Sequence, residues 1–287
     1  MSKITAGSLL AGAAALVWAS YYPLLYMIQG ISPGLLFALP TAIGAACFIP
    51  YLKRNVISTG AVAAVLFAAS QFSIIFSTEL NGVVLTSTFV LFGDAVLSPV
   101  LIYALGRMQE RPAMNIFFPG AAFLIISSFL LTYSSASGPS GFPGILALVL
   151  TPLLVSVYFI YLNEGIRMKG TGVLSTTFLL AALFSPPLLY IFPVGAVSLK
   201  TVAIMVIMGV TSMYAGYLLF FKAVKYTGFV LSSVLMSLIP VFAALLQLIV
   251  NHRATHSESM LLVVAACAGA VLCAFSFSRD EGMKNAA

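Results

Sequence analysis

The stretch that decides the fold is TSTFVLFGDAVLSPVLIYAL, residues 86–105, in which Asp94 is the only charged side chain. A helix rises about 1.5 Å per residue, so about 20 apolar residues cross the ~30 Å hydrocarbon layer of a bilayer. The whole chain of 287 residues is 61% hydrophobic and 7% charged, with mean hydropathy +1.12, whereas about a quarter of the residues of a soluble domain are charged. This composition predicts an integral membrane protein.

Working outward from residues 86–105, ten apolar runs reach spanning length. They are residues 6–28, 33–52, 57–78, 82–105, 114–133, 143–163, 172–193, 200–221, 227–250 and 259–278. Short joints rich in Gly, Pro and charged residues separate them. The runs are too long and too uniformly apolar for the alternating strands of a β-barrel. We therefore predict an all-α integral membrane protein with ten transmembrane helices, the first being a retained helix and not a cleaved signal.

Residues that would indicate an enzyme or a metal site do not occur in a suitable pattern. Cys47, Cys267 and Cys273 lie inside apolar runs without paired spacing, which favours small buried residues over disulfides or metal ligands. His252 and His256 lack the intervening Glu and the third ligand of a zinc protease, and the sequence contains no Gly-x-x-x-x-Gly-Lys phosphate loop. We predict no catalytic site, cofactor or metal.

The basic residues are distributed unevenly among the joints. If the N-terminus lies in the cytoplasm, 11 of the 13 Lys and Arg residues fall inside, and only Lys200 and Arg253 fall outside. This bias orients multi-span proteins, and ten spans return the C-terminus to the cytoplasm. Topology accounts for the net charge of +6, so no nucleic-acid partner is needed. We predict a multi-pass protein of the plasma (inner) membrane.

The chain contains an internal similarity. Residues 86–112 align with residues 227–253 at a constant offset of 141, which pairs Thr86 with Thr227 and Pro99 with Pro240. The same offset places the first five runs over the last five, predicting two repeats, 1–136 and 137–287. Because five is odd, the second repeat crosses the membrane in the opposite sense. Inverted repeats are a construction of secondary transporters, whose sites lie near the bilayer midplane.

Two motifs give the chain a resemblance to a known family. They are Ser98-Pro99-Val100 with Glu110-Arg111-Pro112, and SSVLMSLIPVFAALL at residues 232–246. From about Gly7 to Phe277 the chain resembles the EamA type of the drug/metabolite transporter superfamily. The resemblance implies a gradient-driven carrier or exchanger of small metabolites, with a central cavity between spans 1, 3, 4, 6, 8 and 9. The chain departs from the pattern at Asn251-His252, where Gly-Glu is usual, and at FALPTA (37–42), where an Arg is often found; the second departure prevents assignment of a substrate by resemblance.

Asp94 is the first candidate for a functional residue. It lies near the middle of its span, where an ionised Asp facing lipid costs at least ~3 kcal/mol on insertion scales. On an α-helix Ser87, Asp94 and Ser98 share one face. The residue is interpreted as a proton-coupling carboxylate or a counter-ion for a cationic or zwitterionic substrate. The alternative is a protonated carboxyl that only holds a neighbouring helix.

Polar and aromatic residues of other spans complete the predicted substrate site. Trp18, Tyr22, Tyr26 and Gln29 follow one another at helical spacing and form either a cavity wall or, for Tyr26, part of an interfacial aromatic belt. The residues assigned to the cavity are Trp18, Tyr22, Gln71, Asp94, Tyr158, Tyr214 and Ser237; each taken singly is also explained by helix packing.

Three further residues are candidates for controlling access. Glu79 belongs either to an outer entrance or to a solvated helix end. Pro99 and Pro240 each remove a backbone hydrogen bond, so we expect kinks that either move as gates or statically shape the bundle.

These observations together predict a secondary active transporter that moves a small organic metabolite by alternating access. Amino acids or related amines are favoured because an aromatic wall and one buried acid suit an amphipathic zwitterion or cation. Proton coupling would run through Asp94. An exporter of lipophilic drugs or cations is the nearest alternative, followed by a non-transporting scaffold or a membrane enzyme. The expected partners are the lipid bilayer, the substrate and protons, in a monomer or homodimer.

Overall fold

The computed structural model describes residues 3–28, 30–105, 113–134, 141–236, 238–251 and 257–284, and all regular structure in these ranges is helical. The first half contains α1 (Lys3–Met27), α2 (Pro33–Phe48), α3 (Ile57–Asn81), α4 (Val83–Phe92), the π-helical segment η3 (Gly93–Leu97), α5 (Ser98–Ala104) and α6 (Met114–Ser134). The second contains α7 (Gly141–Lys169), α8 (Gly172–Ala182), α9 (Ser185–Ile191), α10 (Leu199–Met208), the π-helical segment η4 (Gly209–Gly216), α11 (Tyr217–Met236), α12 (Ile239–Asn251) and α13 (Ser257–Lys284). Two short 3₁₀ turns, Ile49–Tyr51 and Arg54–Val56, join α2 to α3.

Helices lie over every segment that the sequence predicted as a span. Among the described residues, six stretches are long and apolar enough to cross a membrane: Ala6–Met27, Pro33–Tyr51, Ile57–Asn81, Gly141–Lys169, Gly172–Ile191 and Leu199–Phe229. Two shorter apolar helices are Met114–Ser127 and Met260–Cys273. The all-α membrane class is thus supported, whereas ten crossings and cytoplasmic ends stay predictions.

Two glycines with the same backbone φ bear on how the two halves of the sequence align. Gly82 precedes α4 and Gly228 interrupts α11, both with φ of +79°, a conformation that favours glycine. They lie 146 positions apart, whereas Pro99 and Pro240 lie 141 apart, so a single constant offset does not pair both the glycines and the prolines. The second half has five fewer residues between glycine and proline, a difference that repetitive apolar sequence conceals.

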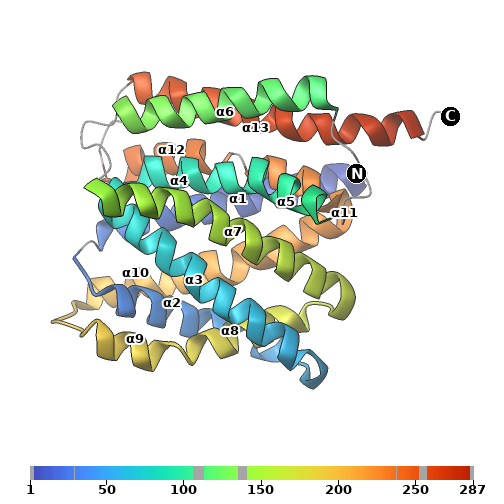
Figure 1. Cartoon of the computed structure of the whole chain (residues 1–287). Helices are drawn as coiled ribbons and strands as arrows, with labels where there is room; N and C mark the ends of the chain where they lie inside the picture. The colour runs from blue at the N-terminus through green and yellow to red at the C-terminus, as the bar shows by residue number, and fades with distance from the viewer. Residues whose placement is uncertain are drawn as a thin grey trace.

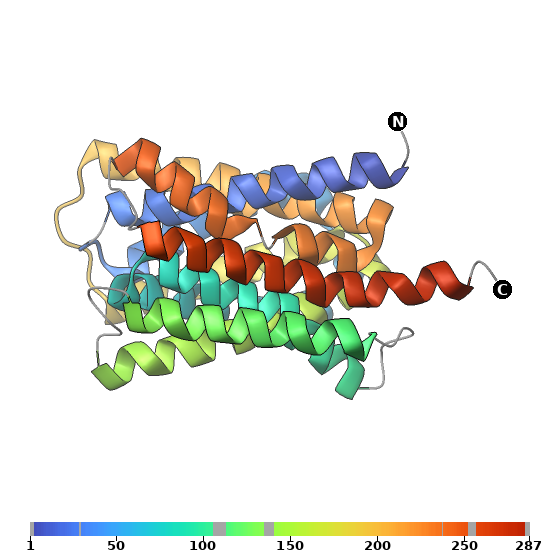
Figure 2. The same cartoon turned by 90° about the horizontal axis from the view of Figure 1, so that it is seen from above.

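The helices of the two halves interdigitate in one bundle (Figure 1). α6 and α13 pack along their lengths as an outer pair, which Figure 2 shows from above. α1 packs against α11 and α12, while α3 packs against α7 and α8. Contact of α6 with α13 is close at Gly120, where an added Cβ would lie 2.8 Å from the Gly269 carbonyl oxygen. The proposed boundary at residues 136 and 137 lies outside the described residues.

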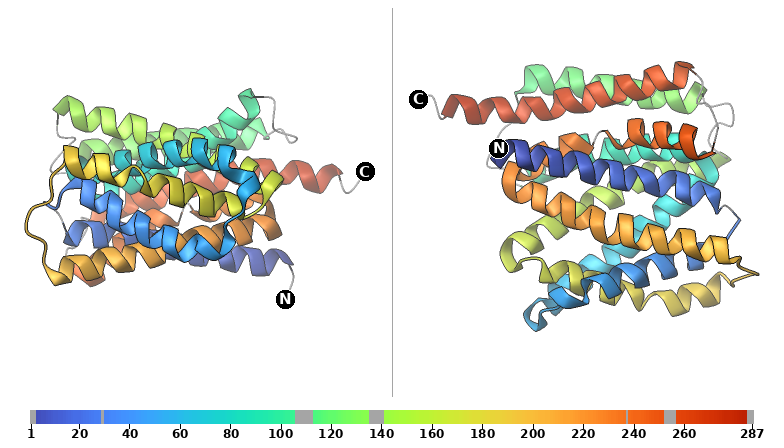
Figure 3. Two further views of the ribbon diagram at one scale, coloured as in Figure 1. Left: turned by 90° about the horizontal axis from the view of Figure 1, so that it is seen from below. Right: turned by 180° about the vertical axis from the view of Figure 1, so that it is seen from behind.

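The two ends of the bundle differ in what they carry. The start of α1 and the end of α13 lie at the same end, together with the turn between α2 and α3 (Figures 1 and 3). The segment 192–198 between α9 and α10 lies at the opposite end, where α1 and α3 finish.

Candidate functional site

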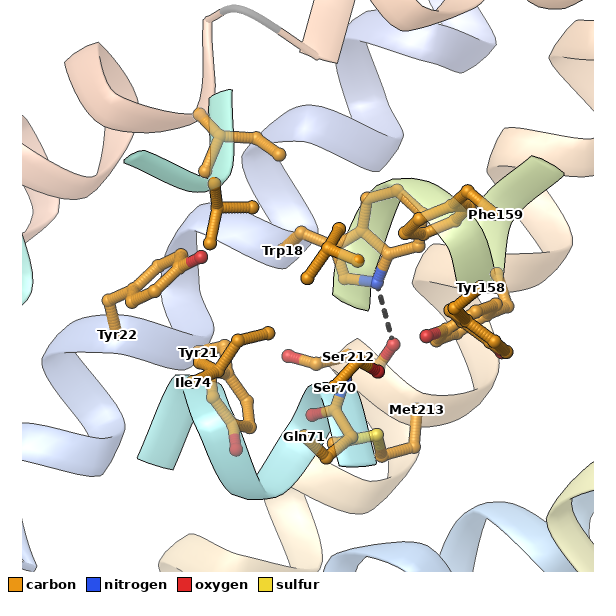
Figure 4. A pocket seen from close by; sticks show the side chains of 14 residues that line it. Trp18, Tyr21, Tyr22, Ser70, Gln71, Ile74, Tyr158, Phe159, Ser212 and Met213 are labelled. Carbon is orange, nitrogen blue, oxygen red and sulfur yellow. Dashed lines mark hydrogen bonds between the residues drawn. The ribbon is translucent and has the colours of Figure 1, made fainter. Parts of the chain in front are cut away.

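A cavity of about 60 Å³ lies between the two halves. Its walls come from α1, α3, α4, α7, η4, α11 and α12, and Figure 4 shows the side chains around it. These are the first, third, fourth, sixth, eighth and ninth of the segments proposed as spans, the set that the family resemblance implied. One water molecule needs about 10–15 Å³ on this scale. The cavity therefore has space for a few waters, and a metabolite requires the helices to move apart.

Trp18 is the central aromatic residue of this cavity. Its indole Nε1 donates a hydrogen bond of 2.9 Å to the Ser212 carbonyl oxygen, the contact drawn in Figure 4. The ring meets Tyr217 at 5.1 Å and Phe159 at 5.6 Å between ring centroids, both edge to face. It also lies directly on Gly216, where an added Cβ would collide with Nε1. Trp18 thus joins α1 to α7 and to the π-helical segment η4.

Both π-helical segments adjoin the cavity. Ser212 and Met213 of η4 line it, and Val90 lines it one turn before η3. An added Cβ at Gly93, the first residue of η3, would lie 2.6 Å from the Pro152 carbonyl oxygen of α7. A π-helix shifts side chains relative to the α-helical pattern and is frequent at functional sites. The helices are therefore least regular where they surround the cavity.

Two hydroxyl groups in the cavity wall, those of Tyr21 of α1 and Ser212 of η4, are buried without a hydrogen-bond partner among the described residues. The buried Tyr158 hydroxyl of α7 has the Tyr217 side chain as its polar neighbour. Tyr158 is only 1% exposed. A buried polar group left unpaired costs about 1–3 kcal/mol, so these hydroxyls need partners inside the cavity, whether water or a ligand. They can donate to or accept from a small polar molecule in the cavity.

Aromatic rings fill the bundle beside the cavity. From Tyr158 the ring contacts run to Phe67 at 5.6 Å and on to Phe178 at 4.8 Å. Phe178 stacks on Phe48 at 5.1 Å, and Phe48 meets Tyr214 at 4.9 Å. Phe48, Phe67 and Phe178 are fully buried. This plug closes the bundle between the cavity and the end of α2.

The structure brings together part of the predicted site. Trp18, Tyr22, Gln71 and Tyr158 line the cavity, but Tyr214 is absent from its wall and packs on Phe48 instead. Tyr217 is in the wall in its place. The sequence reasoning also missed Tyr21, Ser70, Phe159, Ser212 and Met213, of which only Tyr21, beside Tyr22, carried a visible signal.

Five positions singled out in the sequence are only partly described or lie outside the described residues. Ser237 lies outside the described residues, as do Gln29, His252 and His256. Asp94 has its backbone in η3, but its side chain is not among those described. The helical spacing assumed between Asp94 and Ser98 is not kept, because residues 93–97 are π-helical.

The two prolines occupy similar places in their helices. Pro99 is the second residue of α5, directly after η3, and Pro240 is the second residue of α12. At the start of α12 the hydrogen bonding changes as well: the Leu238 amide donates to the Leu235 carbonyl oxygen at 3.2 Å. The predicted departures from α-helical geometry are present at both prolines, while movement there remains a prediction.

Long apolar helices around an interior cavity define a multi-pass membrane protein. Residues 142–275, the second half of the chain, match the EamA-like transporter family of the drug/metabolite transporter superfamily, which confirms the resemblance drawn from the sequence. No curated protein matches the chain. A solved structure titled only "Crystal structure of protein" has the same fold, with TM-score 0.69 and 17% identity over 96% of this chain and 98% of its own.

Proposed function

We propose that this protein is a secondary active transporter of small organic metabolites, with amino acids or related amines as the first class. In this proposal the chain crosses the plasma membrane ten times in two inverted halves. Both termini are cytoplasmic, and the central cavity opens alternately to the two sides. The match to a family of transporters supports this class over an enzyme or a scaffold.

The observation that carries the proposal is that three residues with buried hydroxyls line one aromatic cavity. Tyr21, Tyr158 and Ser212 come from different helices, and Trp18, Phe159 and Tyr217 supply ring surface beside them. A few convergent polar groups on an apolar, aromatic wall are typical of small-molecule sites. An amphipathic substrate with a compact polar head matches this lining.

Asp94 is proposed as the proton-coupling residue. Val90, four residues earlier, lines the cavity, and Gly93 contacts α7 beside Ser156. Carboxylates within membrane spans commonly mark proton or substrate pathways because their burial there is costly. Substrate and proton would then occupy neighbouring positions at mid-helix.

One feature favours a second candidate, an exporter of lipophilic drugs or cations. The described residues of the cavity wall include no charged side chain, and Ile74, Val90, Met213 and Ile239 are apolar. Methionine adapts its shape to varied ligands. Such a wall would accept a lipophilic compound without a carboxylate contact.

Transport by purified protein in liposomes tests both candidates. Counterflow of labelled amino acids, alkyl amines and a lipophilic cation would be measured with and without a pH gradient, for the parent and for Asp94→Asn. We expect the parent to take up an amino acid or amine in a way that depends on the pH gradient, and we expect this dependence to be lost in Asp94→Asn. Gradient dependence that persists in Asp94→Asn would refute the role of Asp94, and transport of the lipophilic cation alone would favour the second candidate. No transport of any compound would contradict both.

A further inference from the structure

A second, smaller recess of about 20 Å³ lies near the end of the bundle opposite the termini. Its polar side chains are Glu79 and Thr78, from the last turn of α3. Leu25, Ile31 and Leu36 form its apolar walls, and Gly30 also lines the recess. The recess therefore combines one carboxylate with a narrow apolar enclosure.

The two polar side chains of the recess make no contact among the described residues that would explain them as part of the fold. Thr78 is 1% exposed, and its hydroxyl has no hydrogen-bond partner among the described residues. Glu79 is exposed at the rim, and within the described chain it has no salt bridge. A buried unpaired hydroxyl is costly, and beside a carboxylate it offers a second acceptor for a cationic donor. The pair points to a positively charged, hydrogen-bonding ligand.

The recess continues the line of the central cavity along the same two helices. On α1, Trp18, Tyr21 and Tyr22 line the cavity, and Leu25 lines the recess one turn further on. On α3, Ser70, Gln71 and Ile74 line the cavity, and Ile75, Thr78 and Glu79 line the recess. The recess therefore lies beyond the cavity along α1 and α3, with Glu79 at its rim.

We propose that the recess at Glu79 and Thr78 binds a primary ammonium group. The Glu79 carboxylate and the Thr78 hydroxyl accept its hydrogen bonds, and the small volume admits a compact R–NH₃⁺ head but not a quaternary ammonium. Charge-assisted hydrogen bonds of this kind are the strong ones. Resting on the proposed transport function, the site is a vestibule that selects amines and zwitterions at the outer end of the path.

Thermal unfolding of the detergent-solubilised chain tests the site without any transport. Trp18 is the single Trp of the sequence, so its fluorescence reports the unfolding of the bundle around it. Methylammonium chloride would be titrated at constant ionic strength against choline chloride, whose quaternary head is too large for the recess. A ligand that binds only the folded state raises the unfolding midpoint with its concentration. We expect such a rise with methylammonium.

Matched variants assign the effect to the two side chains. Glu79→Gln should raise the half-saturating methylammonium concentration at least about tenfold, because a hydrogen bond to a charged group is lost. Thr78→Val should raise it less, and Thr78→Ser should restore the parent value. Glu164→Gln removes a carboxylate from the C-terminal part of α7, a helix that does not line the recess. This variant should leave the half-saturating methylammonium concentration unchanged.

Several outcomes would overturn the proposal. They are an equal response in Glu79→Gln, no response in the parent, or equal stabilisation by choline. Stabilisation by Na⁺ or K⁺ that exceeds that of methylammonium and depends on Glu79 would identify a metal-cation site instead. Because binding is measured in detergent, these failures are distinct from a failure of transport in liposomes.

Discussion

At the scale of single residues, Tyr158 is the position where an effect on transport is most easily separated from an effect on folding. It is almost fully buried in the cavity wall, where its hydroxyl has the Tyr217 side chain as its polar neighbour. Tyr158→Phe should change the unfolding midpoint little, because the ring contacts stay and only one buried hydroxyl is removed. The same change should raise the KM for transport by about 2- to 12-fold, the equivalent of a net hydrogen bond of about 0.5–1.5 kcal/mol.

Tyr161→Phe is the matched control for this prediction. Tyr161 lies on the same helix and is partly buried, but it is not in the cavity wall. Both proteins would be compared by counterflow and by thermal unfolding in one detergent. A KM for Tyr158→Phe equal to that of the control would contradict a hydrogen bond to substrate.

Where the helix is regular, residues that the sequence assigned to one site by their spacing lie together in the structure. Trp18 and Tyr22, four residues apart on α1, both reach the cavity, and so do Gln71 and Tyr158. Tyr214 lies outside the cavity wall. It belongs to residues 209–216, which are π-helical, and a π-helix changes the faces that successive side chains occupy. The spacing of apolar residues in the sequence does not reveal a π-helix. The hydroxyl of Ser212 was missed for the same reason.

At the scale of elements, the contact of η3 with α7 depends on a missing side chain. An added Cβ at Gly93 would lie 2.6 Å from the Pro152 carbonyl oxygen and 2.9 Å from its Cα, both backbone atoms. Gly93→Ala should therefore push the two helices apart and destabilise the fold by about 1–3 kcal/mol, the usual cost of overpacking. Transport should fall as well, because α4 and α7 both contribute to the cavity wall.

Gly12→Ala tests the same substitution where space is open. Gly12 lies within α1, and an added Cβ there meets no atom within 4 Å. Alanine in a helix interior is favoured over glycine by about 0.5–1 kcal/mol, so this variant should unfold at a higher temperature than the parent. Opposite shifts of the two midpoints are expected, and shifts of the same sign would argue against close packing at Gly93.

Most element positions could be predicted from the sequence because apolar run length determines them. α6 begins at the predicted residue and ends one residue beyond the predicted span. The breaks inside runs could not be predicted, as at Gly228, where the left-handed conformation ends the helix seven residues after the predicted end at residue 221. A glycine in an apolar run has no local signal that distinguishes a chain reversal from close packing.

At the scale of the whole molecule, the fold holds its shape with little shared sequence. The solved structure of the same fold has 17% identity over 96% of the chain. The fold depends on the pattern of apolar residues and on small residues at helix contacts, and many different sequences meet these two requirements. The cavity wall depends instead on individual side chains from separate helices, which the apolar pattern does not determine. The fold was therefore more predictable than the site.

The orientation of the bundle gives the last prediction. The turn between α2 and α3 lies at the same end as the termini, and the segment between α9 and α10 lies at the opposite end. Leu52 and Val194 are 50% and 44% exposed at these two ends. In a variant whose native cysteines Cys47, Cys267 and Cys273 are replaced, Val194→Cys should react with a membrane-impermeant maleimide in intact cells. Leu52→Cys should react only after permeabilisation, because the excess of Lys and Arg places its end in the cytoplasm. Labelling of both in intact cells would contradict the crossing of the membrane between them, and the reverse pattern would invert the predicted orientation and place Glu79 on the cytoplasmic side.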